Sequence, residues 1–218
     1  GVPVPLDEAE GKVLYVWFDA PIGYISATKE WARDKNQPDL WKTYWQDDDT
    51  KLVHFIGKDN IVFHCIMFPA MLMEHGEFVL PDNVPANEFL NLEGNKLSTS
   101  KNYAVWLEDY VEKYPVDPLR YYLTTTAPET RDSDFTWHEY LQRNNSELAD
   151  ILGNFINRTL AFTNKRFDGK VPARGPLDAA DEEMINVLRQ APEKIGLCFE
   201  NFEMRKAATA FMDVSRAA

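Results

Sequence analysis

The chain has 218 residues, of which 44% are hydrophobic, and a formal net charge of −12. A chain of this size and apolar content is expected to fold around a buried core rather than to remain disordered. No stretch approaches the roughly 18 uninterrupted apolar residues of a membrane helix, so we expect no membrane partner. The acidic balance argues against a broad nucleic-acid surface, but it is uneven, with a net charge of −11 over residues 1–135 and −1 over residues 136–218. This asymmetry favours two modules with different partners.

Two cysteines, Cys65 and Cys198, lie far apart in apolar stretches. This placement suits neither a disulfide framework nor a cysteine-based zinc site, and it favours a reducing, cytoplasmic location. The opening residues, "GVPVPLDEAEGK", lack a basic and apolar signal pattern and indicate an interior segment of a longer protein.

The first part of the chain alternates between β-rich apolar runs and helical patterns. We expect a strand at 12–20, a helix at 24–35, a strand at 51–57, a helix at 58–76 that bends near Pro69, and short strands within 77–94. Strand and helix in alternation predict a parallel sheet with crossover helices. Because ligands bind beyond the carboxyl ends of such strands, residues 17–24 and 57–64 are expected to line one site.

The second part of the chain is helical by pattern. We expect helices at 105–114 and 115–128, a longer helix entered through 129–148, and helices from about 137 to the end, with a loop at 168–178. The apolar residues of the first of these recur at helical spacing.

The segment "GKDN" (57–60) joins the second predicted strand to the helix after it. Gly57 permits a tight turn, the helix N-terminus offers free N–H groups and Lys58 adds a cation, so the turn suits a phosphate or a nucleotide. Asp59 would accept hydrogen bonds from a ribose, or it would only cap the helix. His64 follows one turn later, where a lone histidine is more often a core residue than a catalyst.

The segment "WFDAPIGY" (17–24) indicates an apolar pocket for a small ligand, with Trp17 and Tyr24 as large flat walls and Ala20 and Pro21 as small rigid ones. A packed strand end is the alternative. Further on, "EGNKLSTSK" (93–101) is either a turn with a hydroxyl residue capping the next helix, or a mobile loop that brings lysines and hydroxyls to a polyphosphate.

These segments together resemble the methionyl-tRNA synthetase family, whose members are class I aminoacyl-tRNA synthetases. The matching stretches follow the family's order and span almost the whole chain: "YVWFDAPIGYISA", "HFIGKDNIVFHCIMFPAML", "KLSTSK", "PVDPLRYYL", "DSDFTW" and "LADILGNFINR...NKRFDG". The resemblance implies an α/β fold, in which the second half of a Rossmann-like parallel-sheet nucleotide-binding domain is followed by an α-helical bundle domain.

The resemblance also implies a domain order and an activity. Residues 1–95 would be the C-terminal half of the catalytic domain, 96–136 the signature loop with a connecting helical segment, and 137–218 a truncated anticodon-binding domain. The implied enzyme is an ATP-dependent ligase that forms methionyl-adenylate with Mg²⁺ and transfers methionine to tRNA(Met). The family's His-Ile-Gly-His type motif and its zinc-binding insertion do not occur in this sequence, so zinc would bind only upstream and the fragment is expected to be inactive alone.

Individual positions take roles from the resemblance. The implied methionine-binding residues are Trp17, Ala20, Pro21, Tyr24, Asn60 and His64; the ATP-binding residues are Gly57, Lys58, Asp59, Lys96 and Thr99; the catalytic loop residues are Lys96, Ser98, Thr99 and Ser100. This loop departs from the family's Lys-Met-Ser-Lys-Ser signature, since Leu97 replaces Met and Thr99 replaces the second Lys. A neutral hydroxyl cannot replace a cation, so Lys96, Lys101 or Lys58 is expected to share the task.

Asn154 and Arg158 lie four residues apart on one face of a predicted helix and match the family's residues that meet the anticodon. Periodicity alone would favour an ordinary exposed polar pair. Two other functions stay open. One is a class I synthetase for a different amino acid, and the other is a non-catalytic tRNA-binding module descended from a synthetase.

Overall fold

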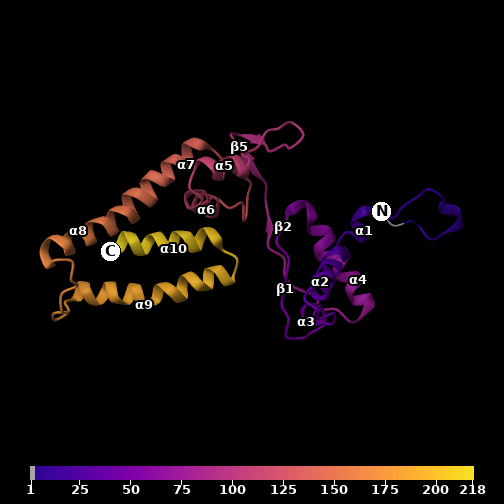
Figure 1. Ribbon diagram of the computed structural model, residues 1–218, viewed down its shortest axis with the longest axis horizontal. Coiled ribbons are helices and arrows are strands. Elements are labelled where there is room, and N and C mark those ends of the chain that lie inside the picture. Colours follow the sequence, from indigo (N-terminus) through magenta and orange to yellow (C-terminus); the bar gives the residue numbers. More distant parts are fainter. Residues whose placement is uncertain (1–2) are drawn as a thin grey trace. The chain divides into compact units, whose positions relative to one another are not determined.

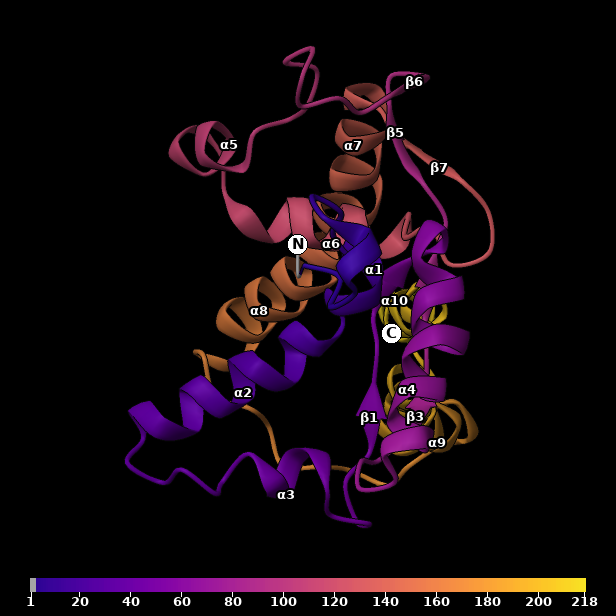
Figure 2. The same cartoon turned by 90° about the vertical axis from the view of Figure 1, so that its right-hand side faces the viewer.

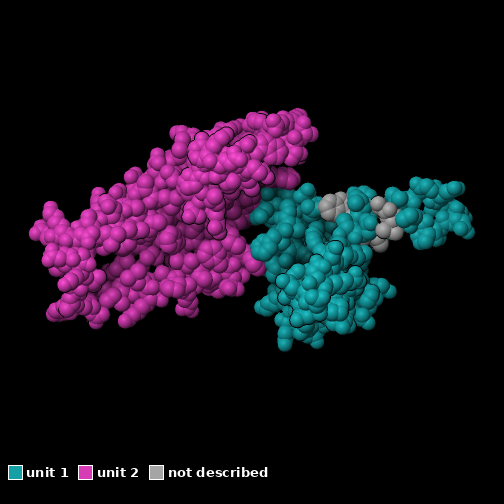
Figure 3. Space-filling model, viewed as in Figure 1, with its two compact units in different colours: residues 1–88 teal, residues 89–218 magenta. Residues whose placement is uncertain are grey.

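The structure is a computed structural model in which residues 3–218 are described, apart from the side chains of Trp17 and Phe18 (Figure 1). The chain divides into two compact units, Gly1–Glu88 and Phe89–Ala218 (Figure 3). The boundary falls inside the stretch in which the sequence predicts short strands. Among the described residues, no helix combines the length and the apolarity needed to cross a bilayer.

The first unit contains short parallel strand pairs and the helices that flank them. Its elements are a 3₁₀ turn (Asp7–Ala9), α1 (Val16–Asp19), α2 (Ile22–Asp34), α3 (Lys42–Trp45), β1 (Leu52–Val53), β2 (Ile56–Gly57), a 3₁₀ turn (Lys58–Asn60), a π-helical segment (Phe63–Met67), α4 (Phe68–His75), β3 (Pro81–Asn83) and β4 (Ala86–Asn87). Strand β1 pairs with β3 and β2 pairs with β4, both in parallel. The parallel pairing predicted from the alternating pattern is confirmed.

The strand predicted at 12–20 is wrong. Val13 forms an isolated antiparallel bridge with Pro3, and the following residues turn into α1, where the Ala20 amide donates to the carbonyl of Val16 at 2.9 Å. A β-rich composition reflects how well side chains fit a half-buried pleated surface. Here Tyr15 is 67% exposed and Val16 57% exposed, so the run lacks the packed neighbour that would hold it extended.

The helix predicted at 58–76 forms, but its winding changes twice along its length. A 3₁₀ turn leads into the π-helical segment, and α4 begins at Phe68, where Pro69 takes a first-turn position that needs no amide hydrogen. Gly76, with φ of +83°, ends the helix in the left-handed conformation.

The core of the first unit is formed by side chains from α2, α3 and α4; Figure 2 shows α2 and α4 on opposite sides of β1. It is formed by Ile25, Trp45, Phe68 and Leu72. Trp45 satisfies its indole N–H by donating to the Thr28 hydroxyl at 2.9 Å, so the largest core side chain is buried without an unpaired donor.

The second unit combines a small sheet with a long helical layer. Its elements are β5 (Leu90–Leu92), β6 (Asn95–Lys96), α5 (Leu107–Lys113), α6 (Val116–Thr125), β7 (Ser133–Phe135), α7 (Trp137–Arg143), a π-helical segment (Asn144–Gly153), α8 (Asn154–Phe167), α9 (Ala179–Glu200) and α10 (Met204–Ala217). The strand order is β6-β5-β7, with β5 antiparallel to β6 and parallel to β7.

Helices α7 and α8 run as one continuous rod through the π-helical segment, and α9 and α10 form a helical hairpin in the same unit (Figure 1). Thr136 caps α7 by accepting a hydrogen bond from the Glu139 amide at 3.1 Å, and Asp178 and Asp181 form a capping box that begins α9. Gly153 ends the π-helical segment. A Cβ there would lie 3.0 Å from the Leu148 carbonyl oxygen, so glycine lets the wide turn close.

Candidate functional site

Tyr24 and His64 join the two stretches that the sequence predicts to line one site. The Tyr24 hydroxyl lies 2.9 Å from His64 Nε2, and His64 Nδ1 lies 3.0 Å from the carbonyl oxygen of Asn60. A carbonyl only accepts hydrogen bonds, so Nδ1 carries the proton and Nε2 accepts from Tyr24. His64 is 2% exposed while Tyr24 is 45% exposed, so a buried imidazole orients a solvent-facing phenol.

The other residues predicted for the amino-acid pocket occupy varied positions. Pro21 is buried at the start of α2, Ala20 is exposed beside it, and Asn60 is half-buried. The backbone carbonyl of Asn60 is hydrogen-bonded to His64 Nδ1, a contact that the sequence does not predict. The Trp17 side chain lies outside the described residues.

The turn after β2 holds the residues predicted to bind ATP. A Cβ placed on Gly57 would lie 2.8 Å from Asp59 Oδ1, so a side chain at this position would displace that carboxylate. Lys58 forms an ion pair with Glu88, and both side chains are about one-third exposed. No local pattern points to Glu88 as a functional residue, because its partner Lys58 lies 30 residues away in the sequence. Asp59 is exposed.

A two-residue turn, Glu93–Gly94, connects β5 to β6. Both residues have positive φ, +48° and +75°, as a type I′ hairpin turn requires. Glycine adopts this conformation freely, whereas glutamate does so at a cost. Two hydrogen bonds offset the cost: the Glu93 amide donates to the Phe135 carbonyl at 2.9 Å, and the Trp137 amide donates to Glu93 Oε1 at 2.8 Å. The end of β7 and the start of α7 therefore hold the turn.

Lys96, the first signature residue, lies in register with a polar pair on the sheet. It is opposite Asn91 on β5, which is opposite Asp134 on β7. Asp134 Oδ2 accepts a hydrogen bond from the Gly94 amide at 2.8 Å, while its Oδ1 is buried without a hydrogen-bond partner among the described residues. The Lys96 ammonium lies 5.5 Å from the centroid of the Phe89 ring, a cation–π contact.

The rest of the signature forms a tight loop. Ser98 and Tyr103 exchange two backbone hydrogen bonds of 2.9 Å, which close it. The Ser98 hydroxyl lies 3.2 Å from that of Ser100 and accepts from the Lys101 amide at 3.3 Å. Thr99 and Lys101 are exposed at the tip. The loop therefore exposes hydroxyl and ammonium groups to solvent, while the backbone hydrogen bonds between Ser98 and Tyr103 hold its two ends together.

Leu97 turns the opposite way from its polar neighbours, as alternation along an extended chain requires. It lines an apolar cavity of about 140 Å³ together with Leu90, Asn91, Leu92, Val105, Leu107, Leu119, Leu123 and Phe135. The alternative interpretation, in which a loop hydroxyl caps the next helix, is wrong. The N-cap of α5 is Trp106, which forms no side-chain cap bond and instead donates its indole N–H to Asn102 Oδ1 at 2.9 Å.

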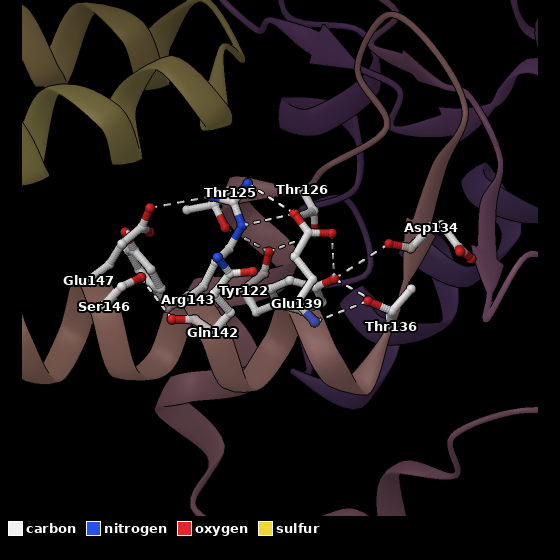
Figure 4. Close-up of polar contacts among 11 residues, drawn as sticks. Tyr122, Thr125, Thr126, Asp134, Thr136, Glu139, Gln142, Arg143, Ser146 and Glu147 are labelled. Carbon is white, nitrogen blue, oxygen red and sulfur yellow. Dashed lines mark hydrogen bonds and ion pairs between the residues drawn. The ribbon is translucent and has the colours of Figure 1, made fainter.

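Polar contacts fasten β7 and α6 to α7 (Figure 4). The Tyr122 hydroxyl lies 3.4 Å from both the Asp134 carbonyl oxygen and Glu139 Oε2. Arg143 bonds Glu139 Oε1 at 3.2 Å and pairs with Glu147 at 3.6 Å, along one face of the helical rod. Asp134, whose side chain holds the hairpin turn, is therefore fixed through its backbone carbonyl to Tyr122 of α6.

Tyr121 extends these contacts to the π-helical segment. Its hydroxyl donates to Glu147 Oε2 at 2.6 Å. Burial, and next the hydrogen bond to Glu147, raise the pKa of Tyr121 well above its ordinary value of 10, so the phenol stays a neutral donor.

Asn154 begins α8 directly after the π-helical segment, and Arg158 follows one turn later. Asn154 is half-buried and Arg158 is exposed. The helix spacing places both on one face, which can present an amide and a guanidinium to a base edge. Among the described residues, no group of three or more His, Cys, Asp or Glu side chains is arranged to hold a metal ion.

Comparisons with known proteins show the family to which the chain belongs. The family model of the class I tRNA synthetases (M) matches residues 1–160. A methionine–tRNA ligase from Salinibacter ruber is 58% identical, and one from Christiangramia forsetii is 57% identical, each over 99% of this chain. The chain spans about a third of the length of these curated relatives (32% and 31%).

Solved structures give the same assignment. The Mycobacterium tuberculosis methionyl-tRNA synthetase bound by methionyl-adenylate matches with a TM-score of 0.79 at 30% identity, covering 100% of this chain and 41% of that protein. Its free state matches with a TM-score of 0.75 at 28% identity. With the α/β architecture and the family model covering most of its length, the chain belongs to the class I tRNA synthetases (M).

Proposed function

We propose that the chain is a segment of a methionine–tRNA ligase, which activates methionine with ATP and transfers it to tRNA(Met). The Tyr24–His64 hydrogen bond supports this proposal most directly, because it joins two segments typical of the family into one pocket wall. Relatives of this name are 57–58% identical across 99% of the chain.

In the proposed reaction, a methionine carboxylate oxygen attacks the α-phosphorus of ATP, and pyrophosphate leaves as methionyl-adenylate forms. Mg²⁺ would enter with the phosphates as part of the substrate. Such chemistry depends on positioning and on neutralising charge more than on a strong base. Lysines and hydroxyls on a short loop fit that requirement, whereas a Ser-His-Asp set is not needed.

The pocket residues select the amino acid. Tyr24, Ala20 and Pro21 would face the methionine side chain, and the His64–Asn60 contact would hold Tyr24 in place. Trp17 stays a predicted pocket residue. A thioether is soft and weakly polar, so a mostly apolar wall with one hydroxyl accepts it.

The residues proposed to bind ATP would do so mainly through charged and hydrogen-bonding side chains. Lys58 would approach the phosphates from its ion pair with Glu88, which restrains the ammonium until ATP competes for it. Asp59 would meet the ribose, in a position that the missing side chain of Gly57 leaves open. In the signature loop, Lys96 and Lys101 would take over the task of the lysine that Thr99 replaces, and Ser98 and Ser100 would donate hydroxyls to the phosphates.

Asn154 and Arg158 would read anticodon bases of the tRNA from α8. The predicted division into residues 1–95, 96–136 and 137–218 stays a prediction, as do the cytoplasmic location and the placement of zinc in an upstream part of the ligase.

The first test is pyrophosphate–ATP exchange by the full-length protein, with each amino acid offered separately. We expect exchange with methionine alone. Exchange with another amino acid would overturn the pocket assignment, and no exchange from a folded protein would favour a tRNA-binding module.

The double variant K96A/K101A should lose most of the exchange rate, while K170A, which removes an exposed lysine from the loop after α8, should not.

A further inference from the structure

Leu97 lies between two signature residues that the proposed reaction uses, Lys96 and Ser98. Lys96 ends β6, which is two residues long and forms one edge of its three-stranded sheet. The register of β6 with β5 stops at the pair of Lys96 and Asn91. Because the chain leaves the sheet at this point, other contacts have to hold the loop against the second unit.

The backbone hydrogen bonds of the loop do not provide those contacts. In the part of the chain that the structure describes, the backbone bonds of residues 98–103 have both partners inside the loop, chiefly the pair between Ser98 and Tyr103. They close the loop but do not fix its direction. At the far end, Tyr103 reaches the sheet by donating its hydroxyl to the Leu92 carbonyl at 2.9 Å. At the near end, the side chain in contact with the rest of the unit is Leu97.

Leu97 lines an apolar cavity of about 140 Å³ whose floor belongs to the core of the second unit. Leu92, Leu119 and Phe135 form this floor, and all three are buried. The rim is partly open, since Leu97 is 37% exposed and Leu107 on α5 is 60% exposed. Leu97 therefore packs on the immobile core with one side and faces solvent with the other.

The two neighbours of Leu97 do not line the cavity. Lys96 is exposed with its ammonium 5.5 Å from the Phe89 ring, and the Ser98 hydroxyl lies 3.2 Å from that of Ser100. In an extended chain, successive side chains point to opposite sides. A change in how Leu97 packs therefore moves the ammonium and the hydroxyl on either side of it.

We propose that Leu97 is a positioning residue: by packing over the apolar cavity, it fixes the direction in which Lys96 and Ser98 project toward the phosphates of ATP. The proposal rests on the proposed function, in which both neighbours act on ATP. A misplacement of about 1 Å can lower a reaction rate on the order of 100-fold. Leu97 would thus control the rate of adenylate formation and leave methionine binding unchanged, because the residues of the methionine pocket belong to the first unit.

Pyrophosphate–ATP exchange by the full-length protein tests the proposal with three substitutions at Leu97. L97A removes most of the contact with the cavity and should lower kcat roughly 10- to 100-fold, with KM for methionine within about twofold of wild type. L97M keeps the volume and the apolar character, so it should hold kcat within about threefold of wild type. L97V, a smaller truncation, should give an intermediate kcat even if L97A does not fold.

L107A is the matched control, because Leu107 lines the same cavity from α5 and lies outside the signature loop. L97A and L107A delete the same atoms at the rim of one cavity, so both should lower the melting temperature. L97A should also lower kcat, whereas L107A should leave kcat within about twofold of wild type. Equal losses of kcat in the two variants, or a wild-type kcat in L97A, would overturn the proposal.

Backbone relaxation measured by ¹⁵N NMR on the 218-residue chain gives a readout that does not depend on activity. The Lys96 and Ser98 amides should have order parameters near ~0.85 in wild type, L97M and L107A, and below about 0.6 in L97A. Unchanged order parameters in L97A would reject the packing of Leu97 as the cause. If order parameters fall in L97A but the wild type shows no exchange with methionine, the proposed function fails while Leu97 still holds the loop.

Discussion

Replacing Asp134 with alanine tests how the signature hairpin is held. The Asp134 carboxylate accepts one hydrogen bond from the Gly94 amide at 2.8 Å, next to the start of β6. A hydrogen bond to a charged group contributes about 1.5–3 kcal/mol. The backbone pairing of β7 with β5 does not involve this side chain, so D134A should loosen the turn without removing the strand.

The expected magnitude follows from that free energy. A loss of about 1.5–3 kcal/mol in the closed state of the turn should speed exchange of the Gly94 amide roughly 10- to 150-fold. Native-state hydrogen exchange, read by NMR on the 218-residue chain, measures this directly. D134N keeps a neutral acceptor and should fall between wild type and D134A.

Asp132 provides the matched control. Its Oδ1 accepts from the Phe89 amide at 3.0 Å, at the other end of β5. D132A should therefore speed exchange at Phe89 and leave Gly94 protected, while D134A should do the reverse. If Gly94 exchanges at the wild-type rate in D134A, the carboxylate does not hold the turn and the reasoning is refuted.

Three further predictions concern other parts of the chain. G57A should displace the Asp59 carboxylate and raise KM for ATP in the full-length protein, while KM for methionine stays within about twofold; the reverse pattern would contradict the assignment. R158A should weaken tRNA binding in a filter assay but leave pyrophosphate exchange unchanged. Loss of both tRNA binding and exchange would contradict the assignment of Arg158 to anticodon recognition. Because burial, and next the neighbouring His64, lower the pKa of His54 on folding, the unfolded chain binds more protons below pH 6.5. Stability should therefore fall as pH drops below 6.5, by at most about 1.4 kcal/mol per pH unit from this group, and H54F should remove that part of the slope in urea unfolding.

Local patterns predict the longer helices well, because these have a periodic apolar face or a clear end, whereas the four-residue helices α1 and α3 are not predicted. Residues 24–35 and 105–114 were predicted as helices, and the structure has Ile22–Asp34 and Leu107–Lys113. The run at 12–20 was misread, since strand formation depends on a neighbour that composition does not report.

Within the candidate site, sequence reasoning identified Tyr24 and His64, and the structure brings them to 2.9 Å. It missed Glu88 and Asp134. Each acts through one side-chain contact with a residue distant in sequence. Such contacts depend on how strands and helices pack, and no periodicity within a short window encodes them.

The ten-residue π-helical segment between α7 and α8 determines the direction in which the side chains of α8 project relative to those of α7. A wider turn advances fewer degrees per residue than the 100° of an α-helix, so the segment offsets the phase of α8 relative to α7. Arg143 and Arg158 would otherwise keep a fixed angular relation along a single α-helix. The π-helical segment therefore sets the rotation of α8 about the helix axis relative to α7. Removing one residue from it would turn the face of α8 by about 100° and leave the contacts of α6 with α7 in place.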